Sequence, residues 1–198
     1  MFSMSRARVL SLVVRPAPPP ARREAAWSLA ELSGRLCELS GGAAVTFAFH
    51  LINESQRAGE PAAWIGTPAS CFFPPDAAGG GVDLEALVVV RAPDSQRVAR
   101  AADQLARSGA FAVLVLDLDG PVPPALLSRL LGLAQKHEVA IAMLSEQPLG
   151  SLVSLRAETQ SRRRAGGTVT CELRVIKDKR RAPGWTVEEV CRGPAGLR

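Results

Sequence analysis

The chain has 198 residues, of which 47% are hydrophobic and 22% are charged. This composition excludes an intrinsically disordered chain, and the length is typical of one α/β domain with short tails rather than of two full cores. No apolar run approaches the ~20 residues that a membrane-spanning helix needs, so we expect a cytoplasmic protein without a membrane partner.

The formal net charge of +5 conceals an uneven distribution of charge along the chain. Residues 1–24 carry five arginines against one acid, and residues 156–192 carry ten basic residues against five acids. Between them, residues 25–155 carry eight basic and thirteen acidic residues. Basic ends on an acidic body favour an anionic partner at those ends, and a merely solubilising surface is the alternative interpretation.

A cluster of prolines between residues 16 and 20 predicts a stiff linker and sets a domain boundary. We therefore divide the chain into a basic, proline-rich N-terminal arm at 1–24, one core domain at 25–192 and a tail at 193–198.

The predicted elements of the core alternate between strand and helix as far as residue 144. Apolar runs predict buried strands, and longer segments with helical spacing and capping residues predict the helices between them. After a weakly helical or turn segment at 25–32, we expect a strand at 36–40, a helix at 45–58, a strand at 62–65, a loop at 66–81, a strand at 87–90, a helix at 95–108, a strand at 111–117, a helix at 123–136 and a strand at 139–144. This alternation is typical of right-handed βαβ units in a mostly parallel sheet flanked by helices.

Beyond residue 149 the pattern changes. Segments at 151–160, 168–177 and 186–191 alternate polar and apolar residues and are separated by glycine-containing turns. Such segments indicate antiparallel strands added to one edge of the sheet. The predicted fold class is therefore α/β, with a mostly parallel sheet and a C-terminal antiparallel β-meander.

The turn between the first strand and the first long helix is the most informative segment. A phosphate-binding loop has the pattern G-x-x-x-x-G-K-[ST] at this place. Here the helix follows Gly41 and Gly42 almost directly, Ala44 stands where the lysine would be, and Thr46 supplies the one remaining hydroxyl. In such a loop a lysine and a run of backbone N–H groups bind the phosphates. The sequence therefore predicts the strand–turn–helix of a nucleotide-binding site without the residues that bind the phosphates. An ordinary strand–turn–helix joint is the alternative.

The order of these parts resembles the core of the RecA family. Residues 34–41 resemble the approach to that family's phosphate loop, and residues 114–117, which end in Asp117, resemble its Walker B strand. Residues 145–147 resemble the polar end of its sensor strand, and residues 173–180 resemble its late strand with a basic turn. The acid that activates water in RecA and the two DNA-binding loops have no counterpart here. The resemblance implies a RecA-like fold over nearly all of the core.

A compact RecA-like chain with these departures is similar to the ImuA group, small RecA-related accessory proteins distantly linked to the cell-division inhibitor SulA. Residues 82–91, 105–110 and 176–180, the last together with Gly184 and Trp185, resemble segments of that group. The resemblance implies a non-catalytic role in the DNA-damage (SOS) response and in translesion mutagenesis. The implied partners are RecA, an ImuB-type Y-family protein and a DnaE-type error-prone polymerase, in the bacterial cytoplasm and at the nucleoid when DNA is damaged.

Few other residues carry recognisable chemistry. Asp117 ends a buried strand where a carboxylate holds Mg²⁺ in ATPases, and a purely structural acid is the alternative. No nucleophile–base pair and no metal-ligand spacing is present in the sequence, so we expect no catalytic residue, no metal site and no cofactor, ATP included. The candidate surface for DNA or a partner is a set of basic residues near the C-terminus, namely Arg162, Arg163, Arg164, Lys177, Lys179, Arg180 and Arg181.

Two other functions stay open on the sequence alone. The first is a weak RecA-like, DNA-dependent ATPase of recombinational repair that holds Mg²⁺ at Asp117 and takes a cation from a neighbour. The second is a SulA-like inhibitor of cell division.

Overall fold

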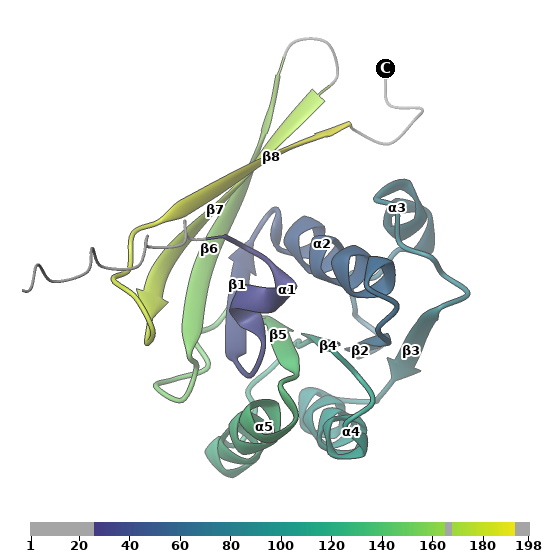
Figure 1. Ribbon diagram of the computed structural model, residues 1–198, viewed down its shortest axis with the longest axis vertical. Helices are drawn as coiled ribbons and strands as arrows, with labels where there is room; N and C mark the ends of the chain where they lie inside the picture. The colour runs from purple at the N-terminus through teal and green to yellow at the C-terminus, as the bar shows by residue number, and fades with distance from the viewer. Residues whose placement is uncertain (1–25, 165–167, 193–198) are drawn as a thin grey trace, which may run out of the picture.

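The computed structural model describes residues 26–164 and 168–192, so the expected arm at 1–24 and tail at 193–198 lie outside the described residues. The elements in chain order are α1 (Leu29–Leu32), β1 (Leu36–Gly41), α2 (Ala44–Arg57), β2 (Ala62–Gly66), α3 (Pro74–Gly79), β3 (Leu87–Arg91), α4 (Ser95–Ser108), β4 (Val113–Asp117), α5 (Pro124–His137), β5 (Ala140–Leu144), β6 (Leu155–Arg163), β7 (Thr168–Asp178) and β8 (Thr186–Arg192). Figure 1 shows their arrangement.

The strands form one sheet, which within the described residues has eight strands in the order β3-β2-β4-β5-β1-β6-β7-β8. From β3 through β6 neighbouring strands are parallel, whereas β6, β7 and β8 pair antiparallel with one another. The sheet confirms the predicted α/β class, with a mostly parallel sheet and a C-terminal antiparallel meander.

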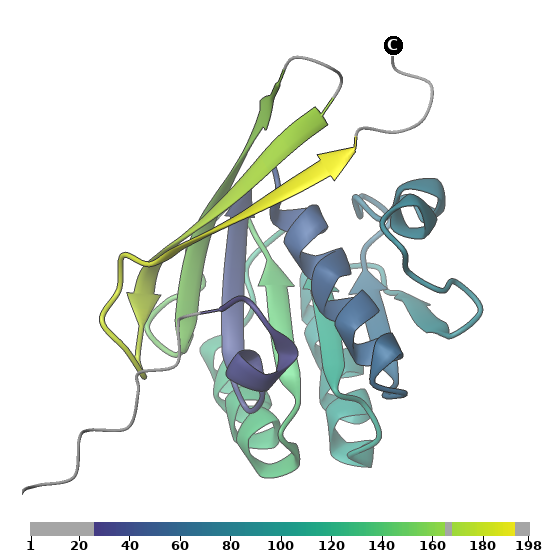
Figure 2. The ribbon, with the colours of Figure 1, turned by 45° about the horizontal axis from the view of Figure 1, so that its top comes forward.

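Helices cover both faces of the parallel part of the sheet (Figures 1 and 2). On one face, α1 and α2 bury Leu32 and Phe47 against the strands. On the other face, α4 and α5 bury Val98 and Leu130. Every residue of β2, β4 and β5 is buried, because strands covered on both faces meet no solvent on either side. This explains the continuous apolar runs in the sequence.

Strand β6 differs from its expected place in the meander. It pairs parallel with β1, with Cys37 opposite Leu155, and only its other edge is antiparallel to β7. The connection after β5 returns to the amino end of β1, where the Ser154 N–H donates to the Leu36 carbonyl oxygen at 2.7 Å. The strand therefore begins at Leu155 rather than at residue 151, because the residues before it form that return connection.

Helix α3 lies within the segment expected to be a loop at 66–81. Pro74 and Pro75 open it, and proline is favoured in the first turn of a helix because its missing N–H has no intrahelical partner there. The abundance of proline and glycine in this segment indicated a loop, yet the same prolines begin a short helix. The weakly helical segment at 25–32 is confirmed as α1, whose N-cap Ser28 accepts a hydrogen bond from the Glu31 N–H at 3.4 Å.

The strands β7 and β8 extend past the body of the sheet and lean over α2 (Figure 2). The Nδ1 of His50 in α2 lies 2.9 Å from a carboxylate oxygen of Glu189 in β8, and this contact ties the last strand to the helix. At the other end of β7, Asp178 pairs with the buried guanidinium of Arg35. Within the described part of the chain, no helix has the length and apolar character needed to cross a membrane.

Candidate functional site

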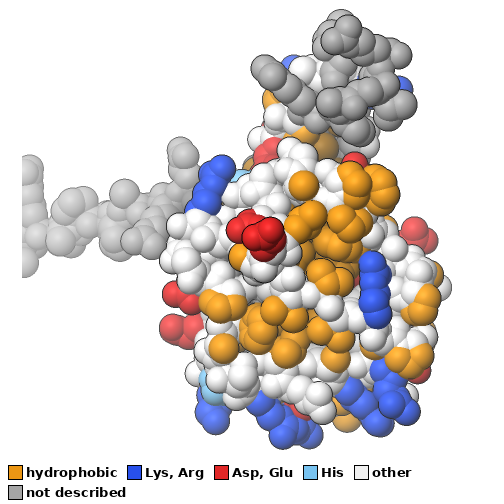
Figure 3. All heavy atoms as spheres, turned by 90° about the vertical axis from the view of Figure 1, so that its right-hand side faces the viewer, with side chains coloured by type: hydrophobic (Ala, Val, Ile, Leu, Met, Phe, Trp, Pro, Cys, Tyr) orange, Lys and Arg blue, Asp and Glu red, His pale blue; other side chains and the backbone are white. Residues whose placement is uncertain are grey.

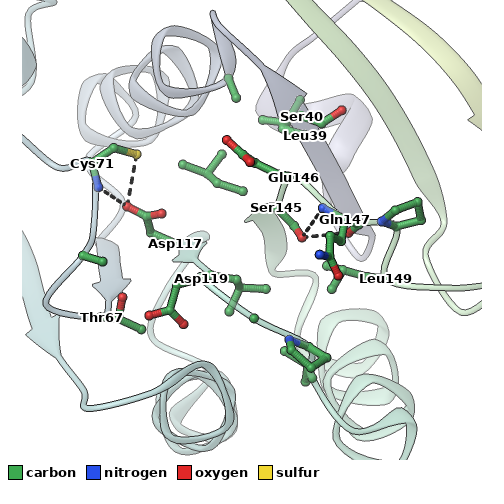
Figure 4. Close-up of a pocket in the computed structure, with 18 of the residues that line it drawn as sticks. Leu39, Ser40, Thr67, Cys71, Asp117, Asp119, Ser145, Glu146, Gln147 and Leu149 are labelled. Carbon is green, nitrogen blue, oxygen red and sulfur yellow. Dashed lines mark hydrogen bonds between the residues drawn. The ribbon is translucent and has the colours of Figure 1, made fainter.

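A cavity of about 630 Å³ lies at the carboxyl ends of β1, β2, β4 and β5. These strands are parallel, so their carboxyl ends meet at one edge of the sheet, which is where open α/β sheets place ligands. The cavity walls include the predicted turn residues Gly41 and Ala44. They also include the acids Asp117, Asp119 and Glu146, which Figure 4 shows. The structure thus brings the predicted turn and the predicted Walker B-like carboxylate to one site.

The turn between β1 and α2 is short. β1 ends at Gly41 and α2 begins at Ala44, so Gly42 and Ala43 alone join them. Gly41 has a φ of 94°, a conformation that favours glycine, and a Cβ there would fall against the Thr159 carbonyl oxygen. The chain therefore passes closely over β6 at this point.

Thr159 of β6 closes this turn. Its hydroxyl donates to the Ser40 carbonyl oxygen at 2.8 Å, and its Oγ1 accepts from the Ala43 N–H at 3.1 Å. One N–H of the turn is therefore bonded within the protein. Thr46, the remaining hydroxyl of the predicted loop, is not part of the cavity wall and lies 3.9 Å from the Cys171 sulfur.

Asp117, at the end of β4, anchors the loop that follows β2. One of its carboxylate oxygens accepts from the Ser70 hydroxyl at 2.5 Å, the Cys71 N–H at 2.8 Å and the Cys71 thiol at 3.2 Å. Figure 4 shows Cys71 directed toward this carboxylate. Desolvation, followed by the neighbouring Asp117 charge, raises the pKa of the Cys71 thiol to about 12. The thiol is therefore a hydrogen-bond donor at neutral pH rather than a nucleophile.

Asp119 lies two residues further on and is held by α4. Its Oδ1 accepts from the Ser95 hydroxyl at 2.7 Å, while the Asp119 and Gly120 N–H groups donate to the Ser95 Oγ. Hydrogen bonds from the Ser95 and Thr67 hydroxyls lower the pKa of the Asp119 carboxyl. Asp119 is accordingly ionised at neutral pH.

The cavity is acidic. Its described lining residues include the carboxylates Asp117, Asp119 and Glu146 and include no lysine, arginine or histidine. Among residues 26–164 and 168–192, no group of three or more His, Cys, Asp or Glu side chains is placed to hold a metal ion. A triphosphate carries several negative charges, which these carboxylates repel and no side chain in the wall neutralises. The residues present do not fit a phosphate group.

The predicted basic residues fall into two separate groups. Arg162 and Arg163 lie opposite Thr170 and Val169 at one end of the β6–β7 pair, whereas Lys177 lies opposite Arg156 at the other end. At about 3.3 Å per residue, the groups are roughly 25 Å apart along β7. The sequence analysis treated these basic residues as one candidate surface. The structure separates them, because the two turns that carry them are at opposite ends of a long hairpin. Arg162, Arg163 and Arg164 are exposed.

The second basic group is bound to the protein itself. Lys177 and Lys179 donate to the carbonyl oxygens of Ser151 at 3.0 Å and Leu152 at 3.2 Å. Arg180 donates to the Ser33 carbonyl oxygen at 3.1 Å. In addition, Arg181 pairs with the Glu31 carboxylate of α1 at 2.7 Å. These contacts attach the turn after β7 to α1 and to the connection before β6. The basic side chains of this group therefore stabilise the fold.

Sequence reasoning missed several residues that shape the site. Ser70 and Cys71 lie in a segment expected to be a loop, and Thr159 is one of four threonines in the alternating C-terminal segments. Glu38 is buried in β1, where it accepts from the Leu149 N–H at 3.2 Å and pairs with Arg156 at 3.0 Å. The sequence offered one signal for Glu38, because a charged residue within an apolar strand is expected to have a buried partner.

Comparisons with known proteins give partial matches to RecA sequences and a match to a solved structure. No protein-family model matches the chain. RecA of Corynebacterium pseudotuberculosis is 37% identical over 95 residues, and RecA of Corynebacterium jeikeium is 35% identical over 94 residues. Each match covers 46% of this chain and 25% of the RecA protein, so the chain spans about a quarter of the length of the curated relatives it matches.

A solved structure extends the likeness to most of the fold. The crystal structure of the RadB recombinase matches with a TM-score of 0.60 at 18% identity, over 79% of this chain and 87% of that chain. The fold is RecA-like. The distant similarity to RecA sequences supports a place in the RecA-like superfamily. In this chain the acidic cavity lies at the carboxyl ends of the parallel strands, beside the turn that the sequence predicted to be a degenerate phosphate loop.

Proposed function

We propose that this chain is a non-catalytic RecA-like accessory protein of the DNA-damage (SOS) response and of translesion mutagenesis. It acts by contact with RecA, whose activity it modulates, or with an error-prone assembly of an ImuB-type Y-family protein and a DnaE-type polymerase. The RecA-like fold supports the superfamily, and the resemblance of segments such as 82–91 to the ImuA group supports the finer role.

The observation that carries the proposal is the acidic cavity beside a closed turn. Phosphoryl transfer depends on positioning and on cations that neutralise the developing charge. Here Ala44 stands in place of the lysine, the Ala43 N–H is bonded to Thr159, and the wall carries three carboxylates without a basic side chain. A RecA-like body that does not grip phosphates retains its surfaces for contact with other proteins.

The test is a titration of the purified chain into RecA at fixed salt, with RecA's DNA-dependent ATPase and strand exchange as the readouts. We expect inhibition that saturates near equimolar RecA, with no hydrolysis by the added chain alone. Absence of any effect at large excess would contradict RecA as the partner and direct the search to the polymerase assembly.

The retained carboxylate at the end of β4 is the one observation that favours a weak ATPase instead. That alternative requires DNA-dependent hydrolysis by the chain and its loss in Asp117→Asn. The matched control is Asp119→Asn, which removes another carboxylate of the same cavity, two residues further along the chain. We expect no hydrolysis from the wild-type chain, measured as phosphate release with RecA as the positive control. Hydrolysis that Asp117→Asn abolishes would overturn the non-catalytic proposal.

A further inference from the structure

Helices α4 and α5 carry most of the basic residues of the acidic body of the chain. Together they hold five of the eight lysines and arginines between residues 25 and 155, against a single acid, Asp103. The five basic residues form an exposed surface, called here the α4–α5 face, which consists of Arg97, Arg100, Arg107, Arg129 and Lys136. Figure 3 shows Lys and Arg side chains gathered along the lower margin of the molecule, where the two helices lie in Figure 1.

The spacing of these residues arranges the charges in two neighbouring rows. Arg100 and Arg107 are seven residues apart on α4, and Arg129 and Lys136 are seven residues apart on α5. Seven residues make two helical turns, so the members of each pair share one stripe of their helix with about 10 Å between them. The two helices are in contact, because the Arg129 guanidinium of α5 lies 2.5 Å from the Asp103 carboxylate of α4.

The protein neutralises only part of this charge. The Asp103 carboxylate also pairs with Arg107 at 2.8 Å, so two guanidinium groups share one acid. Within the described part of the chain, ion pairs and side-chain hydrogen bonds are absent from the other three basic residues of the face, namely Arg97, Arg100 and Lys136. A surface with this excess of one charge attracts a partner of the opposite charge.

We propose that the α4–α5 face binds an acidic segment of a partner protein through pairs between its arginines and the partner's carboxylates. This inference deepens the function proposed above by giving the chemistry of the partner's surface, and it rests on that function only in taking a protein as the partner. The planar guanidinium group binds a carboxylate through two parallel hydrogen bonds, so rows of arginines select carboxylates of matching spacing. Four of the five cations are arginines, which are enriched in protein interfaces, whereas lysine is depleted there.

The construction of the two helices disfavours a nucleic-acid backbone as the occupant. Phosphates are commonly bound by unpaired backbone N–H groups at helix N-termini. At α4 the Asp94 carboxylate accepts from the Arg97 N–H at 2.7 Å, and α5 begins with Pro123 and Pro124, which have no backbone N–H. The Asp103 carboxylate repels a continuous row of phosphates, and neither helix has an aromatic residue on which a base could stack.

A lipid surface is disfavoured for a different reason. An interfacial helix buries large apolar side chains in the membrane beside its basic residues. Within the described part of the chain, the large hydrophobic side chains that are exposed lie outside α4 and α5. The α4–α5 face therefore has the cations of such a helix without its apolar side chains.

The first test measures the binding of fluorescent poly-L-glutamate to the full chain by anisotropy at physiological ionic strength. The variant replaces the three basic residues that have no partner, as Arg97→Gln/Arg100→Gln/Lys136→Gln, and leaves both pairs of Asp103 intact. Glutamine is as good a helix former as arginine and lysine, so we expect circular dichroism to show an unchanged fold. The affinity for poly-L-glutamate should fall about tenfold or more, because three exposed charge pairs are lost.

The matched control removes the same number of charges from a different surface. The variant Arg162→Gln/Arg163→Gln/Arg164→Gln alters three exposed arginines at the far end of the β6–β7 pair. It should bind poly-L-glutamate with nearly the affinity of the wild-type chain, because charges far from the bound peptide are screened by salt. Equal weakening by the two triple variants would show an effect of net charge alone and would overturn the proposal.

A second variant should change the affinity in the opposite direction. Asp103→Asn removes the one acid of the face and leaves Arg107 and Arg129 available to the peptide, so its affinity for poly-L-glutamate should rise by about threefold. The control is Asp76→Asn, which removes an exposed acid of α3 and should leave the affinity unchanged. An equal rise in both variants would contradict the assigned site.

A short mixed-sequence DNA is the competing probe. If Arg97→Gln/Arg100→Gln/Lys136→Gln weakens DNA binding more than it weakens peptide binding, the face is a nucleic-acid surface and the proposal is overturned. A wild-type chain that does not bind poly-L-glutamate overturns it as well. None of these measurements contains RecA or a polymerase, so the failure of this inference is distinguished from the failure of the proposed function, which the RecA titration reports.

Discussion

The Oγ1 of Thr159 accepts a hydrogen bond from the Ala43 N–H at 3.1 Å, although the two residues are 116 positions apart in the chain. This bond joins β6 to the turn where a phosphate loop would open. The hydroxyl also donates to the Ser40 carbonyl oxygen, so one side chain satisfies backbone groups on both sides of Gly41. The turn is thereby a structural joint between β1, β6 and α2.

Replacing this hydroxyl should destabilise the fold. Thr159→Val keeps the size and β-branching of the side chain but leaves the Ala43 N–H and the Ser40 carbonyl oxygen without their partner. A buried polar group without a partner costs about 1–3 kcal/mol, and we expect a loss of that size in the free energy of unfolding by urea.

The matched control lies on the neighbouring strand. Thr170 is equally buried, and its Oγ1 has no hydrogen-bond partner among the described residues. Thr170→Val should therefore leave stability unchanged or raise it slightly, because it removes an unsatisfied polar group. An equal loss in both variants would show that the hydroxyl of Thr159 is not what holds the turn.

The buried pair of Arg35 and Asp178 should dominate stability at the base of the hairpin. Both side chains are fully buried, and Asp178→Asn leaves the guanidinium of Arg35 with only its longer contact to the Glu31 carboxylate, at 3.5 Å, among the described residues. Removing one member of a buried ion pair typically costs about 3–5 kcal/mol, which we expect to see as a lowered midpoint in urea unfolding.

The same pair predicts a dependence of stability on pH. Burial by itself raises the pKa of the Asp178 carboxyl, but the Arg180 N–H and the Arg35 guanidinium outweigh it, and the net pKa is lowered. A lowered folded pKa gives stability that is present above the ordinary carboxyl pKa and is lost as the pH falls through the lowered value. The free energy of unfolding, measured from neutral to acidic pH, should depend less on pH in Asp178→Asn than in the wild-type chain. Glu60→Gln, which alters an exposed acid, should leave this pH dependence unchanged.

The contact between His50 and Glu189 should respond to pH in the opposite direction. The hydrogen bond that the His50 ring donates to the Glu189 carboxylate raises the pKa of His50 above its ordinary value of 6.5. A raised folded pKa gives stability that is present below the unfolded pKa and is lost as the pH rises through the folded value. The effect is small because the histidine is partly exposed to solvent. Titration of the His50 ring by NMR should show the raised pKa, and Glu189→Gln should lower it.

The carboxylate of Asp117 should control the reactivity of Cys71. Desolvation and the Asp117 charge raise the thiol pKa to about 12, so Asp117→Asn, which removes the charge, should lower this pKa and speed alkylation of Cys71. Each unit of pKa changes the thiolate fraction about tenfold, which makes the rate of iodoacetamide labelling a sensitive measure. Asp119→Asn is the control, since Cys71 does not contact that residue. Unchanged labelling of Cys71 in Asp117→Asn would contradict the assigned contact.

Much of the fold was predictable because its signals are local. The apolar run ending at Asp117 indicated a central parallel strand, and Asp94 and Gly109 marked the two ends of α4. The prolines of α3 are compatible both with a loop and with the first turn of a helix. Only the packing of Ala77 into the core favours the helix. The basic residues were visible in the sequence, but the length of β7 places Arg163 and Lys177 at opposite ends.

The sequence by itself determined the α/β class, the order of the elements and the absence of a lysine after Gly42, because composition, periodicity and motif spacing are properties of neighbouring residues. Only the tertiary structure decided what surrounds the turn. Parallel strands bring their carboxyl ends together from distant parts of the chain, which places Asp117, Asp119 and Glu146 in one wall. The same packing places β3 at the edge of the sheet formed by the described residues, because the strand order depends on which distant segments pair.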